Sequence, residues 1–170
     1  KDKRDLESKL FHSYDIIGKS QAIEKVKSLI GKLKNAESRI FISGPAGSGK
    51  ELVARQIHKQ STRSKKPFVV VNGALLDPQK YELELFGSEN TNETTNFGFF
   101  EKAKDGTLLI DEVTEIPLET QAKILRVLTD QKFRRVDGSK EINVNVRIIS
   151  TSNKNIREEV DKGNFREDLY

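Results

Sequence analysis

Residues 40–51 read Ile-Phe-Ile-Ser-Gly-Pro-Ala-Gly-Ser-Gly-Lys-Glu, and the rest of the chain is organised around them. A short apolar run enters a loop with three glycines in six positions, and a helical pattern follows from Glu51 to about Gln60. Glycines let a backbone wrap closely around a polyphosphate, because a Cβ would block the approach. The loop amides and the N-terminus of the next helix offer hydrogen-bond donors and partial positive charge to phosphates. The stretch therefore predicts a strand, a phosphate-binding loop and a helix.

The spacing of this loop is the G-x-x-x-x-G-K pattern of nucleotide-binding proteins, in which Lys50 reaches the terminal phosphates. Glu51 stands where a Ser or Thr usually follows, and it has no hydroxyl to offer to Mg²⁺. The alternative interpretation is a glycine-rich turn before a basic helix, which the strand-to-helix context disfavours. The predicted cofactor-binding residues of the loop are Gly44, Pro45, Ala46, Gly47, Ser48, Gly49, Lys50 and Glu51.

Length and composition are those of one globular domain. The chain has 170 residues, of which 33% are charged and 35% hydrophobic, with a net charge of +4. Charges of both signs are mixed along the chain, so the net charge alone does not indicate nucleic-acid binding. There is no cysteine, and no apolar run approaches the roughly 20 residues of a membrane span. We expect a cytoplasmic protein that does not contact a membrane. Because methionine is absent even at position 1, we also expect a fragment of a longer polypeptide.

Strand and helix patterns alternate along the chain. The apolar runs that predict buried strands span residues 40–43, 67–72, 106–110 and 144–150. The helical patterns span residues 20–33, 51–60, 77–86 and 117–130, and Asp77-Pro78 predicts the start of the third. This alternation predicts an α/β fold, a three-layer αβα core with a mostly parallel sheet.

Two segments outside these elements carry turn signals. Residues 133–143 contain Asp137-Gly138, a dipeptide that favours a hairpin turn. Residues 88–96 read Ser-Glu-Asn-Thr-Asn-Glu-Thr-Thr-Asn and offer no apolar side chain to a core. We expect residues 88–96 to form an exposed, mobile loop.

A second group of chemically relevant side chains follows the third predicted strand. Asp111 and Glu112 stand at its carboxyl end, where α/β sheets bind ligands. Asp111 is placed to hold Mg²⁺ through water, and Glu112 to polarise the water that attacks the γ-phosphate. A strand end capped by solvated acids is the alternative, and the pair alone would not decide between them. The phosphate loop about 60 residues upstream favours the catalytic interpretation.

These motifs together resemble the central AAA+ ATPase domain of bacterial enhancer-binding proteins, the σ54-dependent response regulators of the NtrC and NtrX type. The resemblance extends from about residue 14 to residue 170, nearly the whole chain, and the family itself carries Glu after the loop lysine. The matching motifs are Gly-Pro-Ala-Gly-Ser-Gly-Lys-Glu at 44–51, Val-Asn-Gly-Ala-Leu at 71–75, Glu-Leu-Phe-Gly at 84–87, Gly-Thr-Leu at 106–108, Gln-Ala-Lys-Ile-Leu-Arg-Val-Leu at 121–128, Val-Arg-Ile-Ile at 146–149 and Phe-Arg-Glu-Asp-Leu-Tyr at 165–170.

The resemblance implies further site residues and an ATPase that uses ATP and Mg²⁺. Ile16, Ile17 and Gly18 correspond to the segment that packs on the adenine. Asn72 corresponds to a switch on the catalytic Glu112, and Asn153 to the sensor asparagine. Arg166 corresponds to an arginine finger that reaches the γ-phosphate of a neighbouring subunit, although an arginine in a charged surface segment is usually only solvated. A finger of this kind implies a hexamer or heptamer ring.

One departure from the family pattern bears on its partner. The σ54-contacting loop of the family reads Gly-Ala-Phe-Thr-Gly-Ala, whereas residues 88–96 contain no such motif and the loop is about four residues shorter. Some NtrX-type regulators lack this motif. We therefore expect an NtrX-like regulator that has lost σ54 contact, because a polar loop tip offers little apolar surface to an interface. The alternative is a fully active σ54-dependent activator that remodels RNA polymerase.

The resemblance also implies a domain organisation. Residues 1–13 are expected to be a linker from a preceding receiver domain, and residues 14–170 an incomplete AAA+ α/β subdomain. The family's last strand, its helical lid and a DNA-binding helix-turn-helix would follow residue 170. In the family's sheet order, the phosphate-loop strand would then be left as an unpaired edge.

Overall fold

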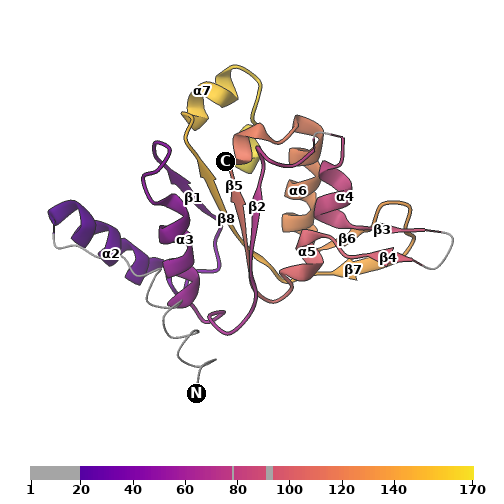
Figure 1. Cartoon of the computed structure of the whole chain (residues 1–170), viewed down its shortest axis with the longest axis horizontal. Helices are drawn as coiled ribbons and strands as arrows, with labels where there is room; N and C mark the ends of the chain where they lie inside the picture. Colours follow the sequence, from indigo (N-terminus) through magenta and orange to yellow (C-terminus); the bar gives the residue numbers. More distant parts are fainter. Residues whose placement is uncertain (1–19, 78, 91–93) are drawn as a thin grey trace.

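The computed structural model describes residues 20–77, 79–90 and 94–170, and its centre is a four-stranded parallel sheet (Figure 1). All three strand pairings in this sheet are parallel. The expected α/β fold with a parallel sheet is therefore confirmed. In spatial order the strands are β1 (Ile40–Ser43), β8 (Arg147–Ser152), β5 (Thr107–Asp111) and β2 (Phe68–Asn72).

Helices cover both faces of the sheet, because successive side chains of each strand point to opposite faces. Leu109 and Ile149 face one side and pack with Ile30, Ala54 and Ile57 from α2 and α3. On the other side, the cluster formed by α4, α5 and α6 packs on Leu108, Ile110 and Ile148. The helices are α2 (Gln21–Leu33), α3 (Lys50–Lys59), α4 (Tyr81–Phe86), α5 (Phe99–Lys102), α6 (Leu118–Asp130) and α7 (Ile156–Asp161), with short 3₁₀ turns η1 (Val113–Glu115) and η2 (Glu167–Leu169).

Local sequence explains where α2 begins, but it does not give the start of α4. The Ser20 hydroxyl accepts a hydrogen bond from the Ile23 amide at 3.2 Å and caps α2. The expected start of α4 near residue 77 is wrong, because that helix begins at Tyr81. The Asp77 carboxylate accepts a bond from the Gln79 amide, and its carbonyl accepts one from the Lys80 amide at 2.8 Å. Asp77 thus stabilises a separate turn before the helix, and Pro78 lies outside the described residues.

Two short hairpins extend from the α4–α6 side of the sheet. The predicted hairpin at 133–143 is confirmed as β6 (Lys132–Arg134) paired antiparallel with β7 (Glu141–Asn143). The second hairpin pairs β3 (Ser88–Glu89) with β4 (Thr95–Asn96). The described part of residues 88–96 is therefore not the free loop that the sequence predicted, and residues 91–93 lie outside the described residues.

A half-buried charge cluster explains why this polar segment is ordered at its base. The Arg135 guanidinium, 11% exposed, forms ion pairs with Glu89 and with Glu101, the latter at 2.7 Å. These carboxylates hold the pKa of Arg135 above its usual value, chiefly through the Glu101 hydrogen bonds. Backbone bonds from the Glu89 amide to the Val136 carbonyl and from the Val136 amide to the Gly87 carbonyl join the two hairpins. A polar side chain can therefore anchor a loop when its charge is paired inside the fold.

Strand β1 forms one edge of the sheet and pairs only with β8 among the described residues, as the family's strand order predicts. In the same part of the chain, no helix combines the length and apolar character that crossing a membrane requires. The predicted linker at 1–13 lies outside the described residues.

Candidate functional site

The predicted phosphate loop connects the end of β1 to the start of α3 (Figure 1). Gly47 and Gly49 adopt φ values of 76° and 90°, a left-handed conformation that side chains rarely tolerate. Gly47 and Gly49 therefore stand at the two positions of the loop where the backbone is left-handed. The Gly49 carbonyl accepts the Val53 amide at 3.1 Å, which starts α3 directly at Lys50. The N-terminus of α3 and its dipole are thus directed toward the space above the loop.

Lys50 folds back over this loop. Its Nζ donates hydrogen bonds to the carbonyl oxygens of Gly44 at 2.8 Å and Pro45 at 3.0 Å, and the residue is 9% exposed. The ammonium is held by neutral carbonyls alone, with no carboxylate partner among the described residues. An anionic phosphate would be a stronger partner for it than these carbonyls. The position suits a cation that transfers its hydrogen bonds to a bound polyphosphate.

Asp111 lies at the carboxyl end of β5 between side chains from both neighbouring strands. Thr151 of β8 donates its hydroxyl to Asp111 Oδ1. Asn72 of β2 donates its amide to Asp111 Oδ2 at the long distance of 3.5 Å. The parallel register explains this group, because Asn72 and Asp111 are direct partners across the sheet. The resemblance predicted that Asn72 acts on Glu112. In the structure Asn72 contacts Asp111 instead, and no hydrogen bond joins Asn72 to Glu112 among the described residues.

Glu112 occupies a strained backbone position immediately after β5. Its φ and ψ are 53° and 51°, the left-handed region that a residue with a Cβ adopts at a cost. The Glu112 amide donates to the Thr151 hydroxyl at 3.3 Å, which helps to fix this conformation. The half-buried Glu112 carboxylate has no hydrogen-bond or ion-pair partner among the described residues. It is therefore available to accept a proton from a water molecule.

Contacts through Ser152 connect the phosphate loop to the end of β8. The Gly44 amide donates to the Ser152 carbonyl at 3.2 Å. The Ser152 hydroxyl lies 3.0 Å from that of Thr114, just beyond Glu112, and also accepts the Lys154 amide at 3.0 Å. Asn153 follows directly and is exposed at this same edge of the sheet.

Thr151 and Ser152 were not among the site residues predicted from the sequence, although both contact segments that carry predicted ones. Two hydroxyl residues at the end of a buried strand, just before Asn153, are the signal that could have identified them.

Arg166 lies away from these contacts. Its guanidinium forms a two-point ion pair with Asp168, at 2.9 and 2.6 Å, and its backbone amide donates to Gln121 Oε1 at 2.9 Å. The hydrogen bonds to Asp168 raise the pKa of Arg166 and lower the pKa of the Asp168 carboxyl. No contact among the described residues joins Arg166 to the phosphate loop, Asp111 or Glu112. Its side chain is exposed, so it is accessible to another molecule.

The remaining predicted contacts are partly outside the described residues. Ile16, Ile17 and Gly18, expected at the adenine, fall in the part that the structure does not describe. No group of three or more His, Cys, Asp or Glu suited to a metal occurs among the described residues. Asp111 with the Thr151 hydroxyl nevertheless fits Mg²⁺, because this ion is commonly held by one or two carboxylates, waters and the phosphates of a nucleotide.

Comparison with known proteins gives a consistent result. A family model described as "Sigma-54 interaction domain" matches residues 16–170. The chain is 43% identical over 162 residues to the nitrogen assimilation regulatory protein NtrX of Azorhizobium caulinodans, covering 95% of this chain and 36% of that protein. It is 42% identical over 160 residues to the DNA-binding transcriptional regulator NtrC of Escherichia coli K12, covering 92% and 34%.

Solved structures agree in fold. NtrX from Brucella abortus superposes with a TM-score of 0.89 and 46% identity, covering 98% of this chain and 38% of that one. The same protein in complex with ATP gives a TM-score of 0.88 and 44% identity, covering 99% and 40%. The chain spans a little over one third of the length of these relatives.

Proposed function

The chain belongs to the Sigma-54 interaction domain family of AAA+ proteins, whose members include NtrX and NtrC, and from this premise we propose that it binds and hydrolyses ATP as part of an NtrX-like response regulator. One observation carries the proposal. The buried Lys50 ammonium lies in a glycine loop that is hydrogen-bonded to the strand end beside Asp111 and Glu112. The structure of NtrX from Brucella abortus in complex with ATP supports ATP as the proposed ligand of this chain.

Each residue of the proposed site has a separate task. The loop amides and Lys50 bind the phosphates, and Glu112 accepts a proton from the attacking water. Asp111 holds Mg²⁺, which neutralises charge on the phosphates when bound with ATP. Asn72 and Thr151 orient the Asp111 carboxylate, and Asn153 faces the nucleotide from the end of β8.

Arg166 supports a proposal of assembly. Because its side chain is exposed and, within the described part of the chain, makes no contact with this chain's own site, its proposed role is to complete the site of a neighbouring copy in a ring. Asp168 holds the guanidinium until a phosphate replaces it. The ring, the preceding receiver domain and a DNA-binding helix-turn-helix belong to the whole regulator that we propose, in which residues 1–13 are the linker.

Mixing two inactive variants tests the proposed ring. We expect Arg166→Ala to bind ATP normally but to hydrolyse it at least about 100-fold more slowly, as for other transition-state contacts. Lys50→Ala is inactive for the different reason that it lacks phosphate binding. Mixed together at high concentration, the two should recover part of the hydrolysis, because a Lys50→Ala copy donates Arg166 to an intact site. A mixture no more active than its components would contradict an arginine that acts between subunits.

The β3–β4 hairpin supports loss of σ54 contact. The described residues beyond its strand β3 are Asn90 and residues 94–96, all polar and exposed, and they offer no apolar surface. The description of the matching family as a σ54 interaction domain favours a second candidate, an activator that retains this contact. The two candidates differ in what the hairpin does, so the hairpin is the part to change.

We expect replacement of residues 90–94 by Gly and Ser of equal length to leave the ATP dissociation constant within about twofold of the parent, since the described Asn90 and Thr94 are exposed and polar and exposed polar positions tolerate change. Glu89→Ala is the contrasting variant, because it removes one of the two carboxylates that pair with the half-buried Arg135 and should lower the thermal midpoint by several degrees. Isothermal titration and thermal melting make the two measurements. A tenfold loss of ATP affinity in the tip variant would show that the tip belongs to the site.

In the whole regulator, a transcription assay distinguishes a regulator that has lost σ54 contact through the β3–β4 hairpin from an activator that retains it. We expect the unmodified protein to leave a σ54 promoter inactive in a reporter assay while it binds its own DNA site. Strong σ54-dependent transcription would instead support the second candidate.

A further inference from the structure

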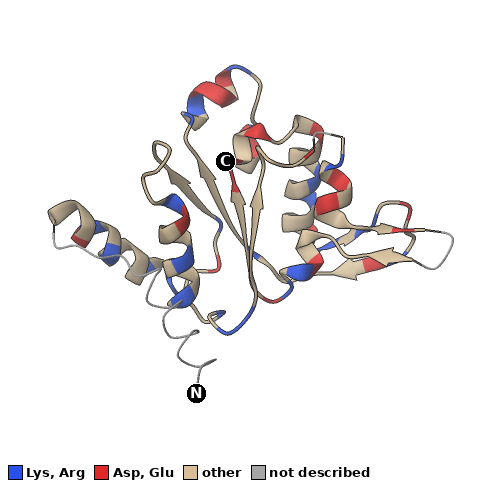
Figure 2. Cartoon of the chain, viewed as in Figure 1, with Lys and Arg blue, Asp and Glu red and all other residues tan. Residues whose placement is uncertain are grey.

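The N-terminal ends of the parallel strands form an edge opposite the phosphate loop, and this edge is strongly basic. Three segments precede β1, β2 and β5 there, at residues 34–39, 59–67 and 102–105, and they contain eight basic and two acidic residues. The whole chain has a net charge of only +4, so the rest of the molecule is slightly acidic. Figure 2 shows Lys and Arg gathered along the lower end of the sheet. We call these three segments the basic edge.

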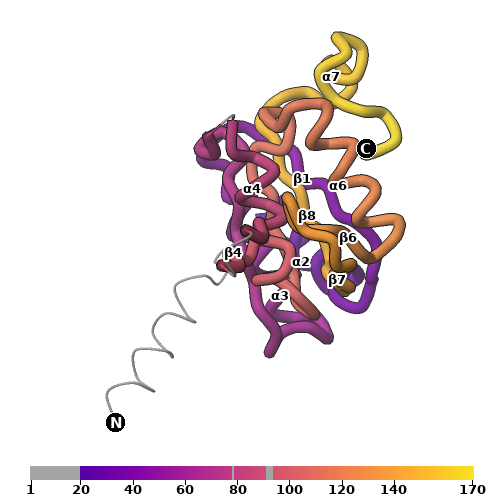
Figure 3. The backbone as a smooth tube through the Cα atoms, turned by 90° about the vertical axis from the view of Figure 1, so that its right-hand side faces the viewer, coloured from indigo at the N-terminus to yellow at the C-terminus, as the bar shows by residue number. Residues whose placement is uncertain are grey.

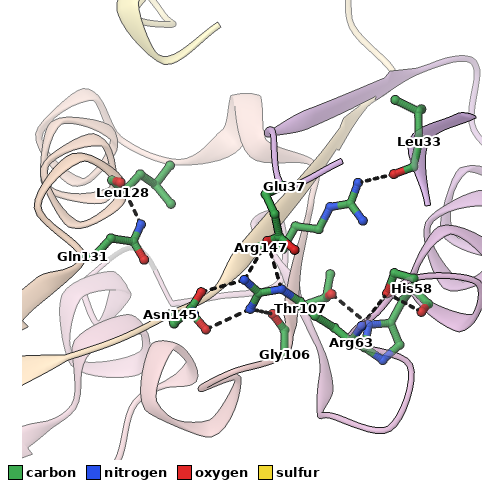
Figure 4. Close-up of polar contacts among 11 residues, drawn as sticks. Leu33, Glu37, His58, Arg63, Gly106, Thr107, Leu128, Gln131, Asn145 and Arg147 are labelled. Atoms are coloured by element: carbon green, nitrogen blue, oxygen red, sulfur yellow. Dashed lines mark hydrogen bonds and ion pairs between the residues drawn. The ribbon is translucent and has the colours of Figure 1, made fainter. Parts of the chain in front are cut away.

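Arg63 holds the basic edge together (Figure 4). Its guanidinium donates to Glu37 at 2.7 Å, to the Gly106 carbonyl at 3.1 Å, and to the carbonyl and side chain of Asn145 at 3.1 and 2.6 Å. The Arg63 side chain is 12% exposed. One cation therefore joins the chain before β1, β5 and β8. The neighbouring basic side chains project from a fixed frame and not from separate flexible loops.

The fold also buries a cation behind this frame. Arg147 is 2% exposed and donates to the Leu33 carbonyl at 2.8 Å, while its Nε has no hydrogen-bond partner among the described residues (Figure 4). Burial lowers the pKa of Arg147, and burial likewise lowers the pKa of the nearby His58. The His58 ring lies 2.8 Å from the Thr107 hydroxyl and 3.0 Å from the Lys66 carbonyl. The Arg147 guanidinium thus lies behind the frame with one nitrogen unpartnered among the described residues, whereas the lowered pKa of His58 favours its neutral form.

Six exposed cations of the basic edge have no acidic partner among residues 20–77, 79–90 and 94–170. Glu37 is occupied by Arg63, and Asp105 is the other carboxylate of the three segments. The exposed cations that lack a carboxylate partner among the described residues are Lys34, Arg39, Lys65, Lys66, Lys102 and Lys104. From their number and their fixed placement, we propose that the basic edge binds the phosphate backbone of duplex DNA without reading its sequence.

The character of the edge favours duplex DNA over other polyanions. Stable protein partners need apolar or aromatic anchors, and single strands need aromatic rings on which bases stack. The exposed large apolar side chains of the described chain all lie outside the three segments. Phe97, which precedes α5, already has the Arg135 guanidinium 5.3 Å from its ring centroid. Lysine ammonium groups contact phosphates as point charges, and such contacts position a protein on a duplex without specifying bases.

The proposal does not depend on the proposed ATPase function, because the basic edge and the phosphate loop lie at opposite ends of the strands. The test therefore uses the whole 170-residue chain without nucleotide and a fluorescein-labelled 20-base-pair duplex of arbitrary sequence. Fluorescence anisotropy should give a dissociation constant of about 10⁻⁶ to 10⁻⁴ M near physiological salt, as for sequence-independent binding. A second duplex of different sequence should bind equally.

Lys65→Glu combined with Lys66→Glu is the diagnostic variant. Reversing these two charges should weaken binding at least about tenfold and reduce the slope of log K against log salt by about two, since each phosphate contact contributes about 0.9. Both side chains are exposed and neither forms a side-chain bond within the described chain, so the thermal midpoint should not fall. A variant that retains the parent affinity and salt slope would overturn the proposal.

The matched control is Arg157→Glu combined with Lys162→Glu, which changes the net charge by the same amount. These residues lie on and next to α7, which Figures 1 and 3 place at the other end of the molecule. The control should stay within about threefold of the parent affinity, because its charges lie more than a Debye length from a duplex on the basic edge. Equal losses in both variants would show an effect of net charge alone and overturn the proposed surface. Poly-glutamate that bound more tightly than the duplex would overturn the assignment to DNA.

Discussion

Lys50→Ala is expected to abolish measurable ATP binding. The Lys50 ammonium is held over the loop by the Gly44 and Pro45 carbonyls, and a bound phosphate would replace these carbonyls as its partner. A hydrogen bond to a charged group contributes about 1.5–3 kcal/mol, so two lost bonds correspond to a loss of affinity of about 100-fold or more. Isothermal titration calorimetry with ATP measures this change directly.

Two further variants separate the charge of Lys50 from its packing. Lys50→Met keeps the apolar stem in its buried position but removes the ammonium, and it should lose ATP binding as Lys50→Ala does. Lys140→Ala removes an exposed lysine beside the β6–β7 turn and should bind ATP as the parent does. Parent-like affinity in Lys50→Met would show that the ammonium does not bind phosphate, and the assignment of the loop would then be wrong.

The fold and the phosphate loop could be predicted because their signals are local in the sequence. Glycines three and five residues after Gly44 are needed where the loop adopts positive φ, and the lysine follows at once. Apolar runs of four to seven residues are likewise long enough to mark the buried strands. The carboxyl end of β5 was identified for the same reason, since Asp111 and Glu112 stand directly after such a run.

Contacts between distant segments could not be predicted in the same way. The Arg135–Glu89 pair joins residues 46 positions apart, and no local pattern shows that this carboxylate is paired inside the fold. Because no local pattern shows this pairing, residues 88–96 were expected to form an exposed, mobile loop. The hydroxyl of Thr151 reaches Asp111 across 40 positions, through a strand order that only the folded sheet establishes. Side-chain partners therefore depend on topology, which the resemblance to a family supplied only in outline.

The basic edge illustrates the same limit for charge. Its three segments are separated by 19 and 34 residues, and each looks like an ordinary solvated stretch in a chain of mixed charge. A parallel sheet brings the starts of all its strands to one side, so their preceding loops share a surface. Net charge alone gave no indication of nucleic-acid binding, whereas the placement of the charges supports it.

Glu112→Gln is expected to stop ATP hydrolysis while leaving ATP binding intact. The Glu112 carboxylate has no partner among the described residues, and its backbone is fixed in the left-handed region by the bond from its amide to Thr151. Glutamine has nearly the same shape and can adopt this backbone as glutamate does, but its amide cannot accept a proton from water. General base catalysis contributes about 10²–10⁴-fold, so hydrolysis should fall by at least about 100-fold. Phosphate release and isothermal titration measure the two properties.

Glu115→Gln is the matched control, because it makes the same chemical change three residues away. The Glu115 carboxylate lies 2.6 Å from Lys154 Nζ in an ion pair that is partly exposed, and such pairs contribute about 1 kcal/mol or less to stability. The Glu115→Gln variant should therefore hydrolyse ATP at a rate within about twofold of the parent. If Glu112→Gln kept the parent rate, or if both variants lost it equally, Glu112 would not be the base. The free carboxylate in its strained position would then require another explanation.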